Sequence, residues 1–326
     1  MDFQLTEDQE ALRDGVRSFC EGRVSIDALR ELEKTGFDRE LWGELAEMGV
    51  FSLRQSEDAG GVGLGSADAV LVFEELGRCL APGPVTWSHL AADLVDGAAT
   101  GECVVGGIDL SRTNSDPLLI EHLEHIDALL VLRPDGIERI DPKALSGRAI
   151  ERPLDPFTPV HEVAELPAGE RLGDAEAAAR FRLEGAALAS GMLLGIAEAS
   201  QELATDYAKK REQFGRPIGG FQALKHKLAD CYTRQELARA AAYAAGATLD
   251  DPEVGDVLRA VSTAKVLTGD AAMENARACV QIHGGMGYTW EVPAHYYLKR
   301  IWVLENQFGT VGEHAERVAE RIAVGD

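Results

Sequence analysis

The chain has 326 residues, a formal net charge of -23 at pH 7 and 45% hydrophobic residues. This length predicts two or three structural units with an ample core. Because a strongly acidic chain has no basic face with which to release counterions, the charge argues against binding to nucleic acid or to anionic membranes. Any anionic ligand must therefore be held by a few local cations.

The N-terminal stretch MDFQLTEDQEAL is acidic and has none of the cationic, hydrophobic and small-residue regions of a signal peptide. No apolar run approaches the length of a membrane-spanning helix, so we expect a soluble, cytoplasmic protein. The cysteines are scattered without a CxxC pair, which predicts reduced core thiols and no metal site. They are Cys20, Cys79, Cys103, Cys231 and Cys279.

Residues 1–84 have the pattern of a helical N-terminal domain. Thr6 followed by Gln9 fits a capping box, and apolar residues at one-turn spacing predict further helices after Phe37 and after residue 68. APGP at 81–84 ends the last of these helices. The stretch GGVGLG at 60–65 suits a dinucleotide loop or a helix-to-helix turn; no strand pattern precedes it, which favours the turn.

Residues 85–172 change to short apolar runs separated by Pro, Gly and Asp, which predicts a small central β domain. DALLVLRPDGIERID at 127–141 indicates a hairpin around a Pro-Asp-Gly turn. CVVGGIDL at 103–110 is a further candidate strand.

From residue 173 to 326, segments crowded with Ala, Leu and Glu predict long helices. We expect them at about 174–213, 221–248, 252–281 and 311–323, with Pro252 in the first turn of the third. Small side chains let helix backbones approach closely, so the segment predicts a helical bundle. Such bundles often oligomerise.

Two glycine-rich interruptions break this helical segment. The first, REQFGRPIGGFQ at 211–222, places Arg211 at the end of a long helix. Its planar guanidinium suits phosphate oxygens, the next helix offers free N–H groups, and Phe214 could cover a flat base. The alternative is an arginine that pairs with the dipole of its own helix before an ordinary turn. These twelve residues alone leave both open.

The second interruption is QIHGGMGYTWEVP at 281–293. Gln281 closes a helix, and the glycines that follow expose backbone amides to a ligand or to another chain. Glutamine can donate to a phosphate or a base without the repulsion that a carboxylate would add. Taken alone, a glycine-rich helix end is also a simple stop signal.

The pair RxQFGxxIxxFQ and QxxGGxGY, in this order and about seventy residues apart, resembles the acyl-CoA dehydrogenase family. LTEDQEALRDGVRSF, LWGELAEMGVFSL and DAGGVGLGSADAVLVFEELGR, near the other end of the chain, are also similar to that family. The resemblance implies a mainly α fold with an N-terminal helical domain (1–84), a reduced central β domain (85–172) and a C-terminal four-helix bundle (173–326) around which subunits associate.

The resemblance also implies FAD as cofactor, bound across a subunit interface. Arg211 would contact the pyrophosphate and Gln222 the adenosine half. All the matching positions would reach toward a neighbouring subunit's flavin; they are Arg211, Gln213, Phe214, Gln222, Gln281, Gly284 and Gly285.

The chain departs from the family at the catalytic base, a Glu that takes the α-proton of the acyl-CoA. One family position lies in an EGT tripeptide twenty-seven residues after Gln281, where this chain has Phe308. The other lies twenty-six residues before Arg211, where it has Gly185 beside Glu184. One residue of helix turns a side chain by about 100°. No catalytic residue is therefore predicted; Glu184 is kept as a candidate base and Glu305 as a weaker one.

The middle segment also departs from the family pattern. Relatives carry TEPxxGSD and a Trp-x-Thr strand around the flavin ring, whereas this chain has only RTNSDP at 112–117 and no tryptophan between Trp87 and Trp290. The chain thus keeps the residues that grip a neighbour's FAD and lacks those that act on its own. A full-length partner subunit in an α2β2 heterotetramer would supply the ring pocket and base, an arrangement the family uses for steroid side-chain CoA thioesters among others.

The first hypothesis is therefore a subunit of a heteromeric acyl-CoA dehydrogenase that passes electrons to an electron-transferring flavoprotein. The second is a self-sufficient homomeric enzyme with Glu184 as base. The third is a non-catalytic scaffold or binding protein that has only inherited the fold.

Overall fold

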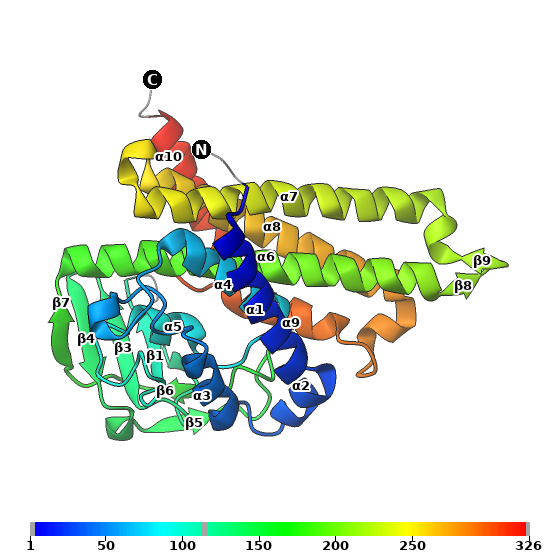
Figure 1. The fold of residues 1–326 in the computed structure, drawn as a ribbon. Coiled ribbons are helices and arrows are strands. Elements are labelled where there is room, and N and C mark those ends of the chain that lie inside the picture. Colours follow the sequence, from blue (N-terminus) through cyan, green and yellow to red (C-terminus); the bar gives the residue numbers. More distant parts are fainter. Residues whose placement is uncertain (1–3, 112–115, 324–326) are drawn as a thin grey trace. The chain divides into compact units, whose positions relative to one another are not determined.

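A computed structural model of the protein describes residues 4–111 and 116–323, and the chain divides into two units (Figure 1). The helical unit combines the chain up to Val24 with Val70–Leu80 and the chain from Ala186 onward. The sheet-containing unit combines Ser25–Ala69 with Ala81–Gly185. The three domains expected from the sequence remain a prediction.

The first helix begins as the sequence predicts. The Gln9 amide donates to Thr6 Oγ1 over 3.2 Å, and the Gln9 side chain accepts from the Thr6 amide over 3.1 Å. Both halves of the capping box are therefore present. Helices in or entering the helical unit are α1 (Glu7–Arg23), α4 (Ser66–Arg78), α6 (Ala175–Lys210), α7 (Gln222–Asp250), α8 (Val257–His283), α9 (Ala294–Leu304) and α10 (Val311–Ala323).

Small side chains line the contact between α7 and α8, where alanines of both helices are fully buried. The buried amide of Asn275 on α8 donates to the backbone oxygens of Ala197 on α6 and Cys231 on α7, over 3.1 and 3.2 Å. The predicted bundle helices are confirmed to within a few residues, except at one start. Pro252 does not open α8, because Pro252–Val254 forms the separate 3-10 turn η4 and the Asp256 side chain caps α8 instead.

In the sheet-containing unit, the first sheet has the strand order β1-β3-β4-β7 and the second β2-β6-β5. The predicted hairpin is confirmed as β3 and β4, which pair antiparallel with Leu132 opposite Ile137. Strand β1 lies within the candidate strand 103–110 and runs parallel to β3. The strands are β1 (Val105–Asp109), β2 (Leu118–Glu121), β3 (Ala128–Arg133), β4 (Gly136–Ile140), β5 (Gly147–Ala149), β6 (Val160–Val163) and β7 (Glu170–Gly173).

Three helices, α2 (Ile26–Leu32), α3 (Arg39–Glu47) and α5 (Val85–Leu90), complete this unit. The glycine-rich stretch 60–65 is a turn between the 3-10 turn η1 (Glu57–Ala59) and α4, so the helix-to-helix interpretation is confirmed. At Gly107, a Cβ would lie 2.1 Å from the Trp87 ring. Only glycine therefore lets α5 pack this closely on β1. Within the described residues, no helix is both long and apolar enough to span a bilayer.

Candidate functional site

The two glycine-rich motifs meet at one end of the helical unit. Tyr207, one turn before Arg211, stacks on His283 with ring centroids 4.2 Å apart. His283 directly precedes Gly284, and its Nδ1–H donates to the Cys279 carbonyl over 2.8 Å, which fixes the ring. Segments about seventy residues apart in the sequence are therefore held side by side.

The first motif folds into a small hairpin beyond α6, formed by β8 (Glu212–Gln213) and β9 (Arg216–Pro217) (Figure 1). Phe214 and Gly215 make its turn with φ of 54° and 76°. Phe214 is 91% exposed, so its ring is available to a ligand or a partner. The Arg216 guanidinium lies over the Phe221 ring, 4.1 Å from its centroid, and stiffens the hairpin base.

The hydrogen-bonding groups of this motif face outward. Arg211 is exposed and forms no ion pair with any residue that the structure describes. Its backbone oxygen accepts from the Ile218 amide over 2.8 Å, which places it directly beside the 3-10 turn η3 (Ile218–Gly220). Gln213 and Gln222 are also exposed.

The second motif presents bare backbone. Gln281 is exposed on the last turn of α8, and Gly284 follows with φ of 61° at the start of the 3-10 turn η5 (Gly284–Tyr288). A Cβ at Gly284 or Gly285 would meet nothing within 4 Å, whereas at Gly287 it would lie 2.5 Å from the Val280 oxygen. Packing thus explains Gly287 but not Gly285, which borders open space.

These residues fit the ADP half of a flavin dinucleotide. Two phosphates need a cation and backbone donors, and an adenine needs a flat apolar surface. Arg211, the Gly284–Gly285 backbone and Phe214 offer these groups at one end of the unit, and none of them is consumed by the chain's own packing. The chain's own contacts therefore leave room for a ligand here.

At the commoner base position, Phe308 is buried at 3% exposure with φ of 54°. The fully buried ammonium of Lys265 holds this turn. His314 Nε2 donates to the Phe308 oxygen over 3.1 Å, while its Nδ1 accepts from Ser262. The three N–H groups of the Lys265 ammonium are shared among four backbone oxygens that lie 2.6 to 3.3 Å from Nζ, those of Leu304, Glu305, Gln307 and Gly309.

Sequence reasoning missed this buried cation. A lysine within the otherwise apolar α8 pattern was the available signal, but its partners are backbone oxygens about forty residues away. Position 308 therefore has no carboxylate, and the backbone carbonyl groups of this turn already accept hydrogen bonds. Glu305 is half-buried on the same turn.

Glu184 lies in the sheet-containing unit between two arginines. Arg54 donates two hydrogen bonds over 3.0 and 3.1 Å, and Arg180 donates a third over 2.7 Å. Burial alone would raise the pKa of Glu184, but the hydrogen bonds and charges of Arg54 and Arg180 outweigh it and lower that pKa below its ordinary value. A general base works best with a pKa near the operating pH, so this carboxylate is poorly suited to remove an α-proton.

Glu184 also lines a cavity of about 370 Å³ together with Phe51, His89 and Phe181. Burial lowers the pKa of His89 to about 4, so its imidazole is neutral. Of the RTNSDP stretch, residues 112–115 lie outside the described part of the chain, and β2 begins just after it.

Comparison with known proteins assigns this arrangement of helices, hairpin and glycine turn to a family. Residues 6–101 match the family described as "Acyl-CoA dehydrogenase, N-terminal domain" and residues 176–323 match "Acyl-CoA dehydrogenase, C-terminal domain". The chain belongs to the acyl-CoA dehydrogenase family. The predicted family, fold class and enzyme class, an FAD-dependent oxidoreductase acting on acyl-CoA, are therefore confirmed. The two matches leave residues 102–175 between them, where the sequence departs from the family pattern.

Acyl-CoA dehydrogenase IpdE2 of Mycobacterium tuberculosis is 32% identical over 321 residues, covering 90% of this chain and 91% of the relative. Acyl-CoA dehydrogenase FadE34 of the same organism is 31% identical over 356 residues, covering 98% of this chain. This chain spans only 49% of FadE34, about half its length.

Among solved structures, the ChsE4-ChsE5 complex from Mycobacterium tuberculosis superposes with a TM-score of 0.86 at 24% identity, covering 99% of both chains. Butyryl-CoA dehydrogenase from Megasphaera elsdenii gives a TM-score of 0.84 at 20% identity, covering 99% of this chain and 100% of the other. At this level of identity both similarities speak for the fold.

Proposed function

We propose that the chain is one subunit of a heteromeric, FAD-dependent acyl-CoA dehydrogenase and completes the flavin site of an unlike partner. The observation that carries the proposal is an imbalance. The groups suited to the ADP half of FAD are exposed at one end of the helical unit, while Phe308 stands buried at the position of the family's base.

In this assignment Arg211 neutralises the pyrophosphate and the Gly284–Gly285 backbone donates to it. Phe214 covers the adenine, and Gln213, Gln222 and Gln281 hydrogen-bond to the nucleotide. When bound, FAD supplies the hydride acceptor for α,β-dehydrogenation of an acyl-CoA thioester. The base and the pocket of the flavin ring belong to the partner, a full-length acyl-CoA dehydrogenase subunit in an α2β2 assembly.

Two similar structures support a heteromer and indicate a substrate class. One is named as the ChsE4-ChsE5 complex, and another, superposed with a TM-score of 0.83 at 24% identity, as the Tcur3481-Tcur3483 steroid ACAD. On this basis we propose a steroid side-chain CoA thioester as substrate. Membership of the family, and no residue of this chain, suggests an electron-transferring flavoprotein as electron acceptor.

Expression alone and with a partner tests the proposal. The partner would be a full-length acyl-CoA dehydrogenase encoded next to this chain. The chain alone should be colourless and inactive, and the co-purified complex should be yellow and active with one FAD for each unlike pair. A yellow, active homomer would overturn the proposal in favour of the self-sufficient enzyme with Glu184 as base. If the partner alone binds as much FAD as the complex does, the result would favour the non-catalytic scaffold.

A further inference from the structure

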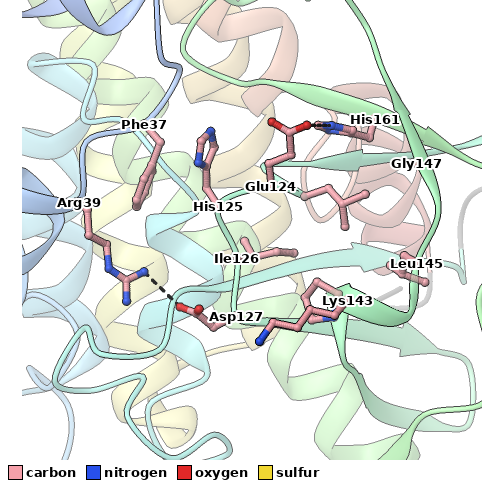
Figure 2. Close-up of a pocket in the computed structure, with 12 residues that line it drawn as sticks. Phe37, Arg39, Glu124, His125, Ile126, Asp127, Lys143, Leu145, Gly147 and His161 are labelled. Carbon is pink, nitrogen blue, oxygen red and sulfur yellow. Dashed lines mark hydrogen bonds and ion pairs between the residues drawn. The ribbon is translucent and has the colours of Figure 1, made fainter.

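A chemically mixed cavity in the sheet-containing unit has a volume of about 560 Å³ (Figure 2). It lies where β3 begins and β4 ends, at the opposite end of the first sheet from Asp109 and Arg133. Its walls come from the loop Leu123–Asp127, from the 3-10 turn η2 (Pro142–Ala144) with Leu145 and Gly147, and from parts of α3 and β6. None of its lining residues belongs to the two glycine-rich motifs.

One wall of the cavity is an imidazole held flat. The His125 ring stacks on Phe37 with centroids 5.2 Å apart and planes 18° apart. Burial lowers the pKa of His125, which favours the neutral ring that suits stacking. With Phe37 against one face of the ring (Figure 2), the other face is left to the cavity, which Leu123 and Ile126 also line.

The second wall carries an acid paired with a buried imidazole. His161 is 4% exposed, and its Nε2–H donates to Glu124 Oε1 over 3.0 Å. The Glu124 side chain is itself 68% exposed. The pair therefore fixes the carboxylate in place and leaves its second oxygen able to accept a hydrogen bond from a ligand. A Cβ at Gly147 would lie 2.7 Å from Leu123 and 3.1 Å from His161, so glycine lets β5 close against this wall.

The two cations of the lining differ in availability. Arg39 is engaged, because it pairs with Asp127 over 3.1 Å and donates to the Glu102 oxygen over 2.5 Å. Lys143 is exposed on η2, and its ammonium forms no ion pair within the described part of the chain. A ligand in this cavity thus meets the exposed Lys143 ammonium, the second oxygen of Glu124 and an apolar, partly aromatic floor.

We propose that this cavity binds a flat organic acid of one or two rings that carries a carboxylate and a hydroxyl group. The ring stacks on the His125 imidazole and covers Leu123 and Ile126. The carboxylate pairs with the Lys143 ammonium, and the hydroxyl donates to Glu124. The volume lies within the range of small-molecule sites and holds two fused rings with a few waters.

Calorimetric titration of the full chain, in its purified complex if it requires one, tests the proposal. The probe is a hydroxynaphthoate with its two substituents on opposite rings, and the comparison ligands are naphthoate and naphthol. We expect saturable one-to-one binding of the hydroxynaphthoate and weaker binding of both comparison ligands. Lys143→Gln should weaken binding about fivefold, as the loss of an exposed ion pair does. The control Lys34→Gln, at an exposed lysine of the same unit outside the cavity, should bind as the wild type does.

A second variant separates the hydroxyl contact from the charge contact. In Glu124→Ala, hydroxynaphthoate should bind no more tightly than naphthoate, because the variant has lost the carboxylate that accepts the hydrogen bond from the hydroxyl group. Absent or unsaturable binding overturns the proposal. So does binding that Lys143→Gln and Glu124→Ala leave unchanged, since the ligand then lies elsewhere.

Discussion

Replacing Arg239 by methionine should destabilise the helical unit through a buried charge network. Arg239 on α7 pairs with Glu198 of α6 over 2.9 Å and with Glu74 of α4, which is fully buried. Tyr243 donates to the other oxygen of Glu74 over 2.7 Å, and Arg17 lies 3.4 Å from Glu198. One guanidinium therefore neutralises two carboxylates from helices far apart in the sequence.

Removing one partner of a buried ion pair costs about 3–5 kcal/mol, because the remaining charge is left without compensation. In the variant, Glu198 still pairs with Arg17 and Glu74 still accepts a hydrogen bond from Tyr243. We therefore expect a loss at the lower end of this range, about 3 kcal/mol. That is a large part of the roughly 5–15 kcal/mol that folds a typical domain. Urea denaturation of Arg239→Met measures this loss of unfolding free energy, with the exposed Arg259→Met on α8 as control.

The loss should depend on pH. Burial raises the pKa of Glu74 to about 7, against the opposing pull of Arg239. Between about pH 4.5 and pH 7 the folded chain therefore keeps a proton on Glu74 that the unfolded chain has released. This group favours folding by up to about 3 kcal/mol at low pH, and that contribution is lost as the pH rises to 7. Arg239→Met should accordingly destabilise the chain more at about pH 8 than at about pH 5.5, and the double variant Glu74→Leu/Arg239→Met should regain much of the loss. A loss under 1 kcal/mol, or one independent of pH, would refute the reasoning.

Two further substitutions concern the two positions where the family carries its catalytic base, one near Phe308 and one near Glu184. Lys265→Met should lower the free energy of unfolding by about 3 kcal/mol or more, because four backbone oxygens lose their buried donor. The exposed Lys227→Met is the control. Equal stability of the two variants would contradict the role of Lys265 in holding this turn. Glu184→Gln should leave turnover of the assembled complex within about threefold of wild type while lowering stability, since it weakens two guanidinium contacts. A loss of about 100-fold or more, absent in the exposed control Glu176→Gln, would instead identify Glu184 as the base.

Local features of this chain were predictable from sequence. The capping box of Thr6 and Gln9 and the β3–β4 hairpin depend on residues close together in the chain, so their patterns were sufficient. The predicted start of α8 was wrong, because Pro252 is compatible both with an α-helix and with the 3-10 turn that it forms. Proline at the first turn is only a preference.

Features that depend on distant partners were not predictable. Glu74 and Arg239 are 165 positions apart, and nothing near either residue indicates that they meet. The same holds for Lys265 with its turn and for the pairing of Glu184 with Arg54. The candidate FAD residues could be chosen only because two motifs occurred together; each motif alone was also consistent with an ordinary helix end.

The flavin content of the assembled complex with Arg211→Ala tests the central claim most directly. A charge-assisted contact to a phosphate contributes about 1.5–3 kcal/mol, so the complex should assemble normally but bind FAD at least tenfold more weakly than the wild type. Arg259→Ala, at the other end of α8 from Gln281, should keep its flavin. A complex that retains full FAD occupancy and affinity without the Arg211 guanidinium would contradict the claim that this chain holds the nucleotide of its partner's flavin.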